Sequence, residues 1–162
     1  MTQDKETKRC SQSQVTLSVL MGPQDVNRLG NVHGGVIMKL VDEAGALAAM
    51  RHAQSSVVTV VIDSMTFMEP VYVGNLLVCK AEVTYVGNTS METRVEVTAE
   101  DPMTGEAKIT NKAYLVYVAL DQNGRPHPVP RLRYETPEEK KRAEQARARQ
   151  EYRKRQSAQE AG

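Results

Sequence analysis

The amino-acid sequence predicts an α+β fold in which a curved antiparallel β-sheet wraps around one long central helix, with a second helix at the C-terminus. The first observation is a single long segment of helical periodicity, residues 34–52, followed by alternating strand-like segments. The second is that this helix is apolar on two opposite sides, which is typical of a helix buried on both. Because one helix cannot cover five flat strands, the economical arrangement is a strongly curved sheet.

At 162 residues the chain has room for one domain with short appendages. We expect a disordered leader over residues 1–12, the folded domain over 13–125, and a Pro-rich linker with a charged helix over 126–162. The formal net charge is +1, and there is no Trp and one Phe, so nothing favours a nucleic-acid partner. No apolar run is long enough for a signal peptide or a membrane span. We therefore predict a cytoplasmic protein without a membrane partner.

Alternating apolar and polar residues, with turn signals between the runs, define the strands. The predicted strands cover residues 14–20, 57–62, 76–86, 91–99 and 108–120. Glycine-containing turns at 87–88, 102–105 and 123–124 separate the later ones. The run VVTVVI at 57–62 is apolar on both faces, which predicts a central strand. The open edge of such a sheet favours a homodimer.

The long helix carries one apolar stripe and, opposite it, a side made of small residues. The stripe comprises Ile37, Leu40, Val41, Ala44, Leu47 and Ala48, and the opposite side comprises Met38, Asp42, Gly45, Ala46 and Ala49. We expect the stripe to pack on the sheet and the small side to lie near a second subunit or a ligand. Asp42 is the one charged residue of that small side, which makes it a candidate general base.

The C-terminal segment begins with a helix-start signal. Residues 125–130 are rich in proline and therefore stiff and extended. Thr136 is the expected N-cap, Pro137 the first helical residue and Glu139 the partner in a capping box. The helix continues to about residue 156 and is polar nearly all round. Two roles stay open: a solvated helix packed loosely on the sheet, or a contact with nucleotide phosphates or a neighbouring dimer.

The segment GNVHGG at residues 30–35, directly before the long helix, is the strongest candidate site. Two glycines at a helix start allow a ligand to approach exposed backbone N–H groups, which suit a carbonyl oxygen that becomes negative during acyl transfer. Asp42 lies about two turns further on, roughly 10–12 Å along the axis, and so cannot easily serve the loop of its own chain. In a two-fold dimer it could serve the partner's loop. No serine lies in a nucleophile elbow, and the two distant cysteines, Cys10 and Cys79, predict neither a metal site nor a disulfide framework.

Several blocks resemble the cytosolic acyl-CoA hydrolase family, which includes a brain-type acyl-CoA thioesterase with two tandem hotdog domains and single-domain bacterial relatives. The blocks are GNVHGGVIMKLVDEAG, VVTVVIDSMTFMEPVYVGN, TSME and TNKAYLVYVALDQNGRPHPVP, and the resemblance covers about residues 12–145. It implies a hotdog fold and hydrolysis of fatty acyl-CoA to a free fatty acid and CoA. It also implies no cofactor other than the CoA of the substrate, and a homodimer that assembles into a trimer of dimers.

The resemblance also implies the site residues. The catalytic residues would be Asn31 and Asp42, with Asn31 of one chain facing Asp42 of the other. Asp42 would activate a water or attack the carbonyl through an anhydride, and the N–H groups near Gly34 and Gly35 would hold the oxyanion. His33 would help to position the substrate or bond to the loop backbone. The remaining candidates are Thr89, Ser90 and Lys112 for the CoA arms, with a solvated surface as the alternative, and Phe67 and Met68 for the acyl channel, with simple core as the alternative.

Two other classes stay in view. Hydratases and dehydratases of the same fold need a close Asp and His, and the stretch from Asp25 to His33 offers both residue types. An acyl-CoA sensor would bind the thioester without cleaving it, although no helix-turn-helix precedes residue 14. Release of free CoA separates the three classes, because only a hydrolase breaks the thioester.

Overall fold

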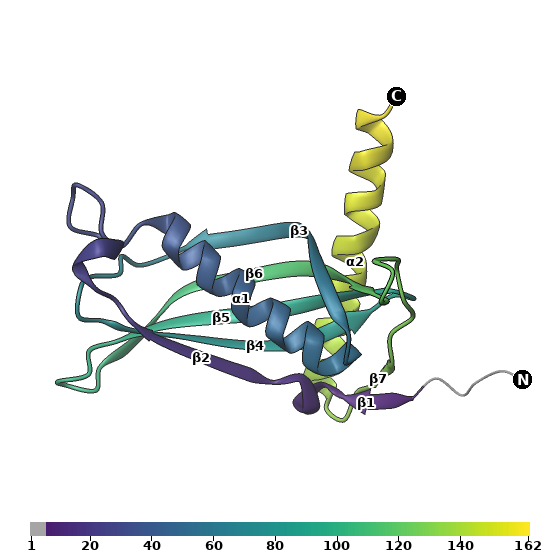
Figure 1. Cartoon of the computed structure of the whole chain (residues 1–162), viewed down its shortest axis with the longest axis horizontal. Helices are drawn as coiled ribbons and strands as arrows, with labels where there is room; N and C mark the ends of the chain where they lie inside the picture. The colour runs from purple at the N-terminus through teal and green to yellow at the C-terminus, as the bar shows by residue number, and fades with distance from the viewer. Residues whose placement is uncertain (1–5) are drawn as a thin grey trace, which may run out of the picture.

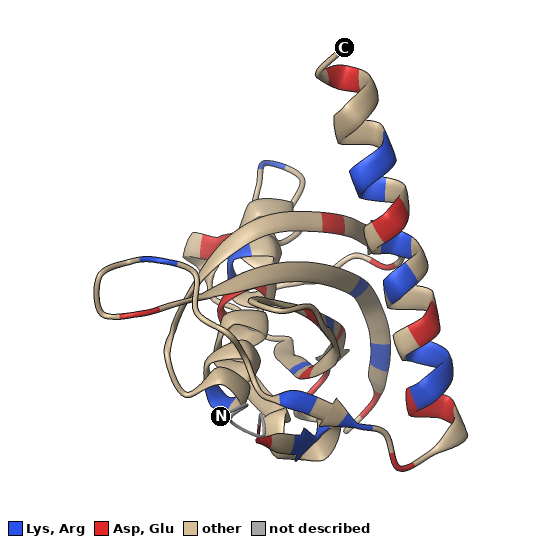
Figure 2. Ribbon diagram, turned by 90° about the vertical axis from the view of Figure 1, so that its right-hand side faces the viewer, with Lys and Arg blue, Asp and Glu red and all other residues tan. Residues whose placement is uncertain are grey.

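The computed structural model describes residues 6–162, and it confirms a curved antiparallel sheet around one long helix (Figures 1 and 2). Five strands are ordered β2-β4-β5-β6-β3, and every neighbouring pair is antiparallel. Helix α1 (Gly34–Ala53) lies on the concave face, and helix α2 (Pro137–Glu160) lies on the convex face. The strands are β2 (Val15–Leu20), β3 (Ser56–Phe67), β4 (Leu76–Val86), β5 (Ser90–Glu100) and β6 (Ala107–Leu120).

Helix α1 packs on the sheet through most of the predicted stripe, and its buried face also takes in small residues that were expected on the opposite side. Gly45 and Ala49, placed by the sequence on the side away from the sheet, are buried, whereas Leu47 of the predicted stripe is 41% exposed. Small residues let the helix axis approach the sheet closely, and the valines and leucines of the strands supply the bulk of the core. The buried residues of α1 are Ile37, Val41, Ala44, Gly45, Ala48, Ala49 and His52.

The prediction that VVTVVI forms a central strand is wrong, because β3 lies at the sheet edge and pairs with β6. Three of its apolar side chains, Val58, Val60 and Ile62, are 43%, 51% and 41% exposed. An apolar edge strand of 12 residues is a template for pairing with another chain. The two apolar faces of this strand therefore indicate an open edge suited to association.

A β-bulge in β4 changes which side chains face outward. The register shifts between Val83 and Tyr85, so that Val83 lies opposite Thr93 while Tyr85 lies opposite Glu92. Directly opposed residues share a face, and Tyr85 therefore belongs to the outer face with Glu92. Regular alternation of side chains along residues 76–86 would place Tyr85 on the same face as Val83, and the extra residue of the bulge places it on the other face.

The predicted disordered leader is wrong from Thr7 onward, and residues 1–5 lie outside the described residues. Strand β1 (Thr7–Arg9) pairs in parallel with β7 (Arg131–Arg133), and a short 3₁₀ helix, η1 (Cys10–Ser13), follows it. The Lys8 ammonium is buried and donates to the carbonyl of His52, 2.9 Å away, near the end of α1. The partner strand lies more than 120 residues away along the chain, so no local sequence pattern could reveal this pairing.

Helix α2 begins where the sequence predicts and is held more firmly than expected. Thr136 Oγ1 accepts from the N–H of Glu139 at 3.1 Å, while the Glu139 carboxylate accepts from the N–H of Glu135, one residue before the expected one. Ala143 and Ala146 are buried. Ion pairs, not loose packing, fix the helix to the convex face, and its C-terminal end extends past the sheet in Figure 1.

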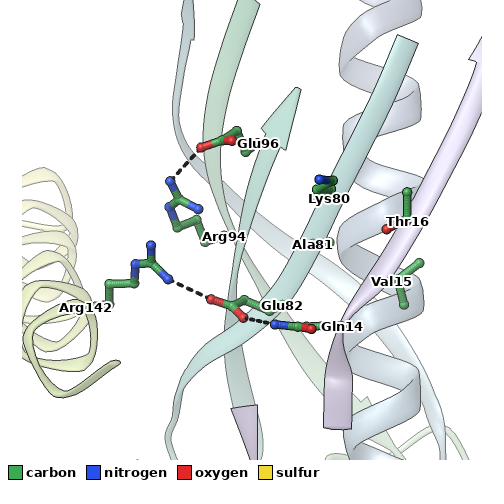
Figure 3. Close-up of a pocket in the computed structure, with 9 residues that line it drawn as sticks. All are labelled: Gln14, Val15, Thr16, Lys80, Ala81, Glu82, Arg94, Glu96 and Arg142. Atoms are coloured by element: carbon green, nitrogen blue, oxygen red, sulfur yellow. Dashed lines mark hydrogen bonds and ion pairs between the residues drawn. The ribbon is translucent and has the colours of Figure 1, made fainter. Parts of the chain in front are cut away.

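Figure 3 shows one of these ion pairs at a charged pocket on the convex face. The Arg142 guanidinium lies 3.0 Å from the Glu82 carboxylate, which also accepts from the Gln14 amide. Arg94 is paired with Glu96 beside them. The two arginines of this pocket already have carboxylate partners in the same chain, whereas Lys80, which also lines it, makes no ion pair within residues 6–162. No helix within residues 6–162 is long and apolar enough to cross a membrane.

Candidate active site

The turn before α1 places the Asn31 side chain in an open pocket. The Asn27 side-chain oxygen accepts from the backbone N–H groups of Leu29 and Asn31, at 2.9 and 3.2 Å, which closes the turn. Gly30 takes a φ of +84°, a conformation that side chains disfavour. The half-buried Asn31 side chain lines a pocket of about 310 Å³ together with Gly34, Phe67 and Met68.

Two backbone N–H groups are free at the start of α1. The first bonds of the helix run from Val36 and Ile37 to the carbonyl of His33, and within residues 6–162 the N–H groups of Gly34 and Gly35 have no acceptor. A Cβ added to Gly35 would meet nothing within 4 Å, so a ligand has space to approach. The His33 ring is exposed and makes no capping hydrogen bond; its backbone N–H donates to the Asp25 carbonyl at 2.8 Å.

The Asp42 carboxylate, at the start of the third turn of α1, is half-buried and held by two hydroxyl groups. Its Oδ1 accepts from Thr59 Oγ1 on β3 at 2.8 Å and from the Tyr117 hydroxyl on β6 at 2.9 Å. Burial, and then the hydrogen bond to Asp42, raise the pKa of Tyr117, so this hydroxyl stays a neutral donor. Across the described chain, Asp42 makes no ion pair and its Oδ2 accepts no hydrogen bond, which leaves one carboxylate oxygen open for chemistry.

Thr59 and Tyr117 were not found by sequence reasoning. Thr59 interrupts the otherwise apolar run VVTVVI, and that interruption was the available signal. Tyr117 sits in the long run KITNKAYLVYVAL, where an aromatic residue is ordinary core. The two are directly opposite on paired strands, a register that a single sequence does not disclose.

The structure separates the two predicted catalytic residues within one chain. Asp42 is eight residues beyond Gly34 on α1, roughly 12 Å along the axis. Phe67 lies at the Asn31 end, where a Cβ on Gly34 would be 3.4 Å from the Phe67 ring. Phe67 and Met68 are 49% and 46% exposed, so they line the mouth of the pocket and are not simple core.

The three residues expected to contact CoA also fall at opposite ends of the sheet. Ser90, adjacent to Thr89, pairs with Val118, whereas Lys112 pairs with Thr66 near the Asn31 end. Val118 and Lys112 are six residues apart on β6, roughly 20 Å of strand. Lys112 is exposed, and Thr89 and Ser90 are half-buried. One protomer alone therefore does not bring Lys112 together with the other two.

No group of three or more His, Cys, Asp and Glu side chains is arranged to hold a metal ion in the described part of the chain. Both cysteines are buried, and burial raises the pKa of each thiol to about 12, which leaves them unreactive. The chemistry available at the site is that of a carboxylate, an amide and backbone N–H groups.

A long helix wrapped by its own curved antiparallel sheet is the hotdog fold, and the carboxylate on the third turn of that helix and the free N–H groups at its start are groups suited to acyl transfer. Residues 29–106 match the Thioesterase superfamily. YkhA of Bacillus subtilis, an uncharacterized acyl-CoA thioester hydrolase, is 38% identical over 134 residues, which are 83% of this chain and 78% of YkhA. The mouse cytosolic acyl coenzyme A thioester hydrolase is 39% identical over 89% of this chain, which spans only 38% of the mouse protein. The chain belongs to the acyl-CoA thioester hydrolase family.

Solved structures agree in fold. A hexameric acyl-CoA thioesterase crystallised in the apo form is 40% identical, with a TM-score of 0.90 over 94% of this chain and 98% of its own. An acyl-CoA hydrolase from Staphylococcus aureus, solved with butyryl coenzyme A, is 34% identical, with a TM-score of 0.88 over 96% of this chain and 94% of its own. That hydrolase has also been solved with an aspartate, an asparagine or a threonine replaced by alanine.

Proposed function

We propose that this protein hydrolyses fatty acyl-CoA thioesters to free fatty acid and CoA, without a further cofactor and in the cytoplasm. The observation that carries the proposal is the Asp42 carboxylate, which is held on one oxygen by Thr59 and Tyr117 and is open on the other. A carboxylate fixed in this way, without a cation beside it, is suited to activating a water or attacking an acyl carbon.

In the proposed mechanism, Asp42 Oδ2 takes a proton from a water as the water oxygen attacks the thioester carbonyl carbon. Alternatively, the carboxylate itself attacks that carbon to form an anhydride, which water then hydrolyses. The negative charge on the former carbonyl oxygen is stabilised by the N–H groups of Gly34 and Gly35, and Asn31 orients the water or the carbonyl. The C–S bond then breaks, and CoA leaves as a thiolate that takes up the proton.

The site is assembled from two chains paired along β3. The two strands of an antiparallel pair run in opposite directions, so pairing β3 with a second β3 places the Phe67 end of one protomer beside the Thr59 end of the other. Asn31 and the glycines of one chain would then face Asp42 of the partner chain, and Lys112 would lie near the partner's end of the sheet that carries Thr89 and Ser90. The exposed valines of β3 support this edge as the contact, and a trimer of such dimers would account for the hexamer seen in the related thioesterase.

Two further observations favour hydrolysis over the other classes. The Staphylococcus aureus hydrolase has been altered at an aspartate, an asparagine and a threonine, the same residue types as Asp42, Asn31 and Thr59. A hydratase would need the side chains of Asp25 and His33 to act together, but the two residues are joined through their backbones, with the His33 N–H donating to the Asp25 carbonyl oxygen at 2.8 Å, and no hydrogen bond joins their side chains within residues 6–162. A sensor without chemistry has no need of a carboxylate held ready by two donors.

The first test is thiol release from acyl-CoAs of short to long chain, measured for the wild type, Asp42→Asn and Asp63→Asn. Asp63 is a matched control, because it is also an acid near β3 but is paired with Arg153 on the convex face. We expect wild-type turnover, a loss of about 10³-fold in Asp42→Asn, and turnover within about twofold in Asp63→Asn. Binding of acyl-CoA without thiol release from the wild type would establish a sensor, and full activity of Asp42→Asn would refute the assigned role.

The second test mixes two inactive variants. Asn31→Ala and Asp42→Asn, each expected to lose at least about 10²-fold, are unfolded together and refolded into mixed dimers. One site of each mixed dimer then carries both native residues, so we expect thiol release to recover toward a quarter of the wild-type rate per chain. Failure to recover in dimers shown by mass spectrometry to be mixed would place Asn31 and Asp42 in the same chain's site.

A further inference from the structure

The buried Tyr117 hydroxyl is wedged against the backbone of α1. Its oxygen lies 2.9 Å from both the Asp42 carbonyl oxygen and Asp42 Oδ1, and the residue is 0% exposed. A Cβ added to Gly45 would lie 2.6 Å from this hydroxyl oxygen and 2.8 Å from Thr93 Oγ1. Any side chain at position 45 would therefore push the hydroxyl away from the helix.

From this packing we infer that Tyr117 is a positioning residue for thioester hydrolysis: it fixes the carboxylate of Asp42 through Oδ1, and Gly45 is required to admit it. The inference rests on the proposed function, since it assigns a part in that same site. Glycine in a helix interior is less favourable than alanine. Here the glycine is explained by the close approach of a hydroxyl that a methyl group would displace.

The two donors to Asp42 form one rigid unit. Thr59 on β3 and Tyr117 on β6 are direct cross-strand partners, so their hydroxyl groups hold a fixed spacing. Both bonds go to Oδ1, which restricts the rotation of the carboxylate and leaves Oδ2 without a hydrogen-bond donor among residues 6–162. Thr59 comes from the edge strand, whereas Tyr117 comes from the interior of the sheet and is the more completely buried donor.

Thr93 confines the Tyr117 hydroxyl from the other side. It lies on β5, the next strand, and is 0% exposed. Its Oγ1 has no hydrogen-bond acceptor or donor of its own among residues 6–162. Both hydroxyl oxygens approach the same point beside Gly45. The Tyr117 ring is fixed in the core, and Thr93 and Gly45 crowd its hydroxyl group. The hydroxyl group is therefore held against Asp42.

The test compares two tyrosine-to-phenylalanine variants on the same strand. Tyr117→Phe removes the hydroxyl and keeps the ring, while Tyr114→Phe is the matched control, because the Tyr114 ring packs on Arg149 on the convex face. We expect Tyr117→Phe to lower kcat about 10- to 100-fold with KM within about threefold, as loss of one hydrogen bond to a charged group predicts. Tyr114→Phe should stay within about twofold of the wild-type kcat.

Two readouts separate positioning from a merely structural role. The acidic limb of the kcat/KM pH profile should move to higher pH in Tyr117→Phe, because a donor to the carboxylate is gone, and should stay in place in Tyr114→Phe. Introducing Tyr117→Phe into Asp42→Asn should cause no further loss. An unmoved acidic limb, or equal losses in both backgrounds, would overturn the inference.

Gly45→Ala provides a second route, because it leaves Tyr117 in place but occupies the space of its hydroxyl. We expect a fall in kcat of about 10-fold with the same shift of the acidic limb. This variant carries the test if Tyr117→Phe does not fold, as judged by circular dichroism. Wild-type kcat and pH profile in Gly45→Ala would overturn the inference. The absence of thiol release from the wild-type protein itself would instead refute the proposed function.

Discussion

Each face of the sheet carries a partly or fully buried carboxylate, and the hydrogen-bond and ion-pair partners of the two carboxylates are opposite in kind. On the concave face, Asp42 receives two neutral hydroxyl groups on one oxygen and no cation. On the convex face, Glu92 is 2% exposed and lies 2.6 Å from the Arg149 guanidinium and 3.7 Å from that of Arg153. A carboxylate with two arginine partners has its charge neutralised and both oxygens occupied, so it can only hold structure. Asp42, by contrast, keeps one oxygen open for chemistry, whereas Glu92 serves only to hold α2 on the sheet.

The polar contacts of the convex face fix α2 to four strands, since Arg142 is also paired with Glu82 on β4. Arg153 also donates to the Asp63 carboxylate on β3 at 2.6 Å, and Arg149 stacks over the Tyr114 ring on β6, 3.7 Å from its centroid. In Figure 2, basic and acidic bands alternate along α2 where it passes the outside of the sheet. Because α2 buries only two alanines, these polar contacts must supply most of its specificity. Disrupting these contacts should therefore loosen the packing of α2 on the sheet and leave the surroundings of Asp42 unchanged.

The largest effect on the convex side is expected from Glu92→Gln, which keeps the shape but removes the charge between Arg149 and Arg153. Breaking a fully buried pair costs about 3–5 kcal/mol. The arginine side chains are 23% and 17% exposed, so solvent offsets part of this, and we expect the free energy of unfolding to fall by about 2 kcal/mol. Urea denaturation measures the change, and thiol release per folded molecule should remain at the wild-type level.

A matched control for Glu92→Gln is Glu151→Gln on α2 itself. Glu151 is paired with Arg147 at 3.4 Å, but both side chains are more than half exposed, and such pairs contribute at most about 0.5 kcal/mol. A similar loss of stability in both variants would mean that burial does not distinguish the convex network. A loss of activity in Glu92→Gln would mean that the two faces are coupled through β5 and β6.

The sequence was sufficient to find the long helix and the five strands of the main sheet, and insufficient to show that β3 is an edge strand or that β1 pairs with β7. Helix α1 and strands β4 to β6 follow from periodicity and turn residues, because these signals are local. The position of β3 at the edge could not be inferred in this way. Its run VVTVVI has the same composition whether a neighbouring strand comes from the same chain or from another one. Likewise, the β1–β7 pairing joins segments separated by nearly the whole chain.

The candidate site shows the same division. Asn31, Gly34, Gly35 and Asp42 stand out because glycines at a helix start and a lone acid among small residues are visible in the sequence. Tyr117 is invisible, because its role depends on strand register and on the space left by Gly45. The buried face of α1 includes most of the predicted stripe but extends to Gly45 and Ala49, because hydropathy marks leucines as buried more readily than glycine and alanine.

The smallest expected effect lies at the far end of α1, where a buried basic group has no carboxylate partner of the kind that Glu92 provides. His52 is 1% exposed; its Nε2 lies 2.9 Å from the Pro130 carbonyl oxygen, and its Nδ1 has no partner among residues 6–162. Burial lowers the pKa of His52, the Pro130 carbonyl opposes the shift, and the charges of Lys8 and Arg131 lower it further.

The folded state therefore binds a proton at His52 at lower pH than the unfolded state, whose histidine titrates near pH 6.5. The stabilisation is fully present above that pH and is lost as the pH falls from about 6.5 through the folded value. His52→Gln retains a donor for the Pro130 carbonyl but cannot titrate. We expect the wild type to lose more stability than His52→Gln between pH 7.5 and 5.5, as measured by thermal unfolding at matched protein concentration. Equal losses of stability in the wild type and His52→Gln would show that His52 is protonated equally in the folded and unfolded states. An unpartnered basic group near the end of α1 would then carry no cost in stability.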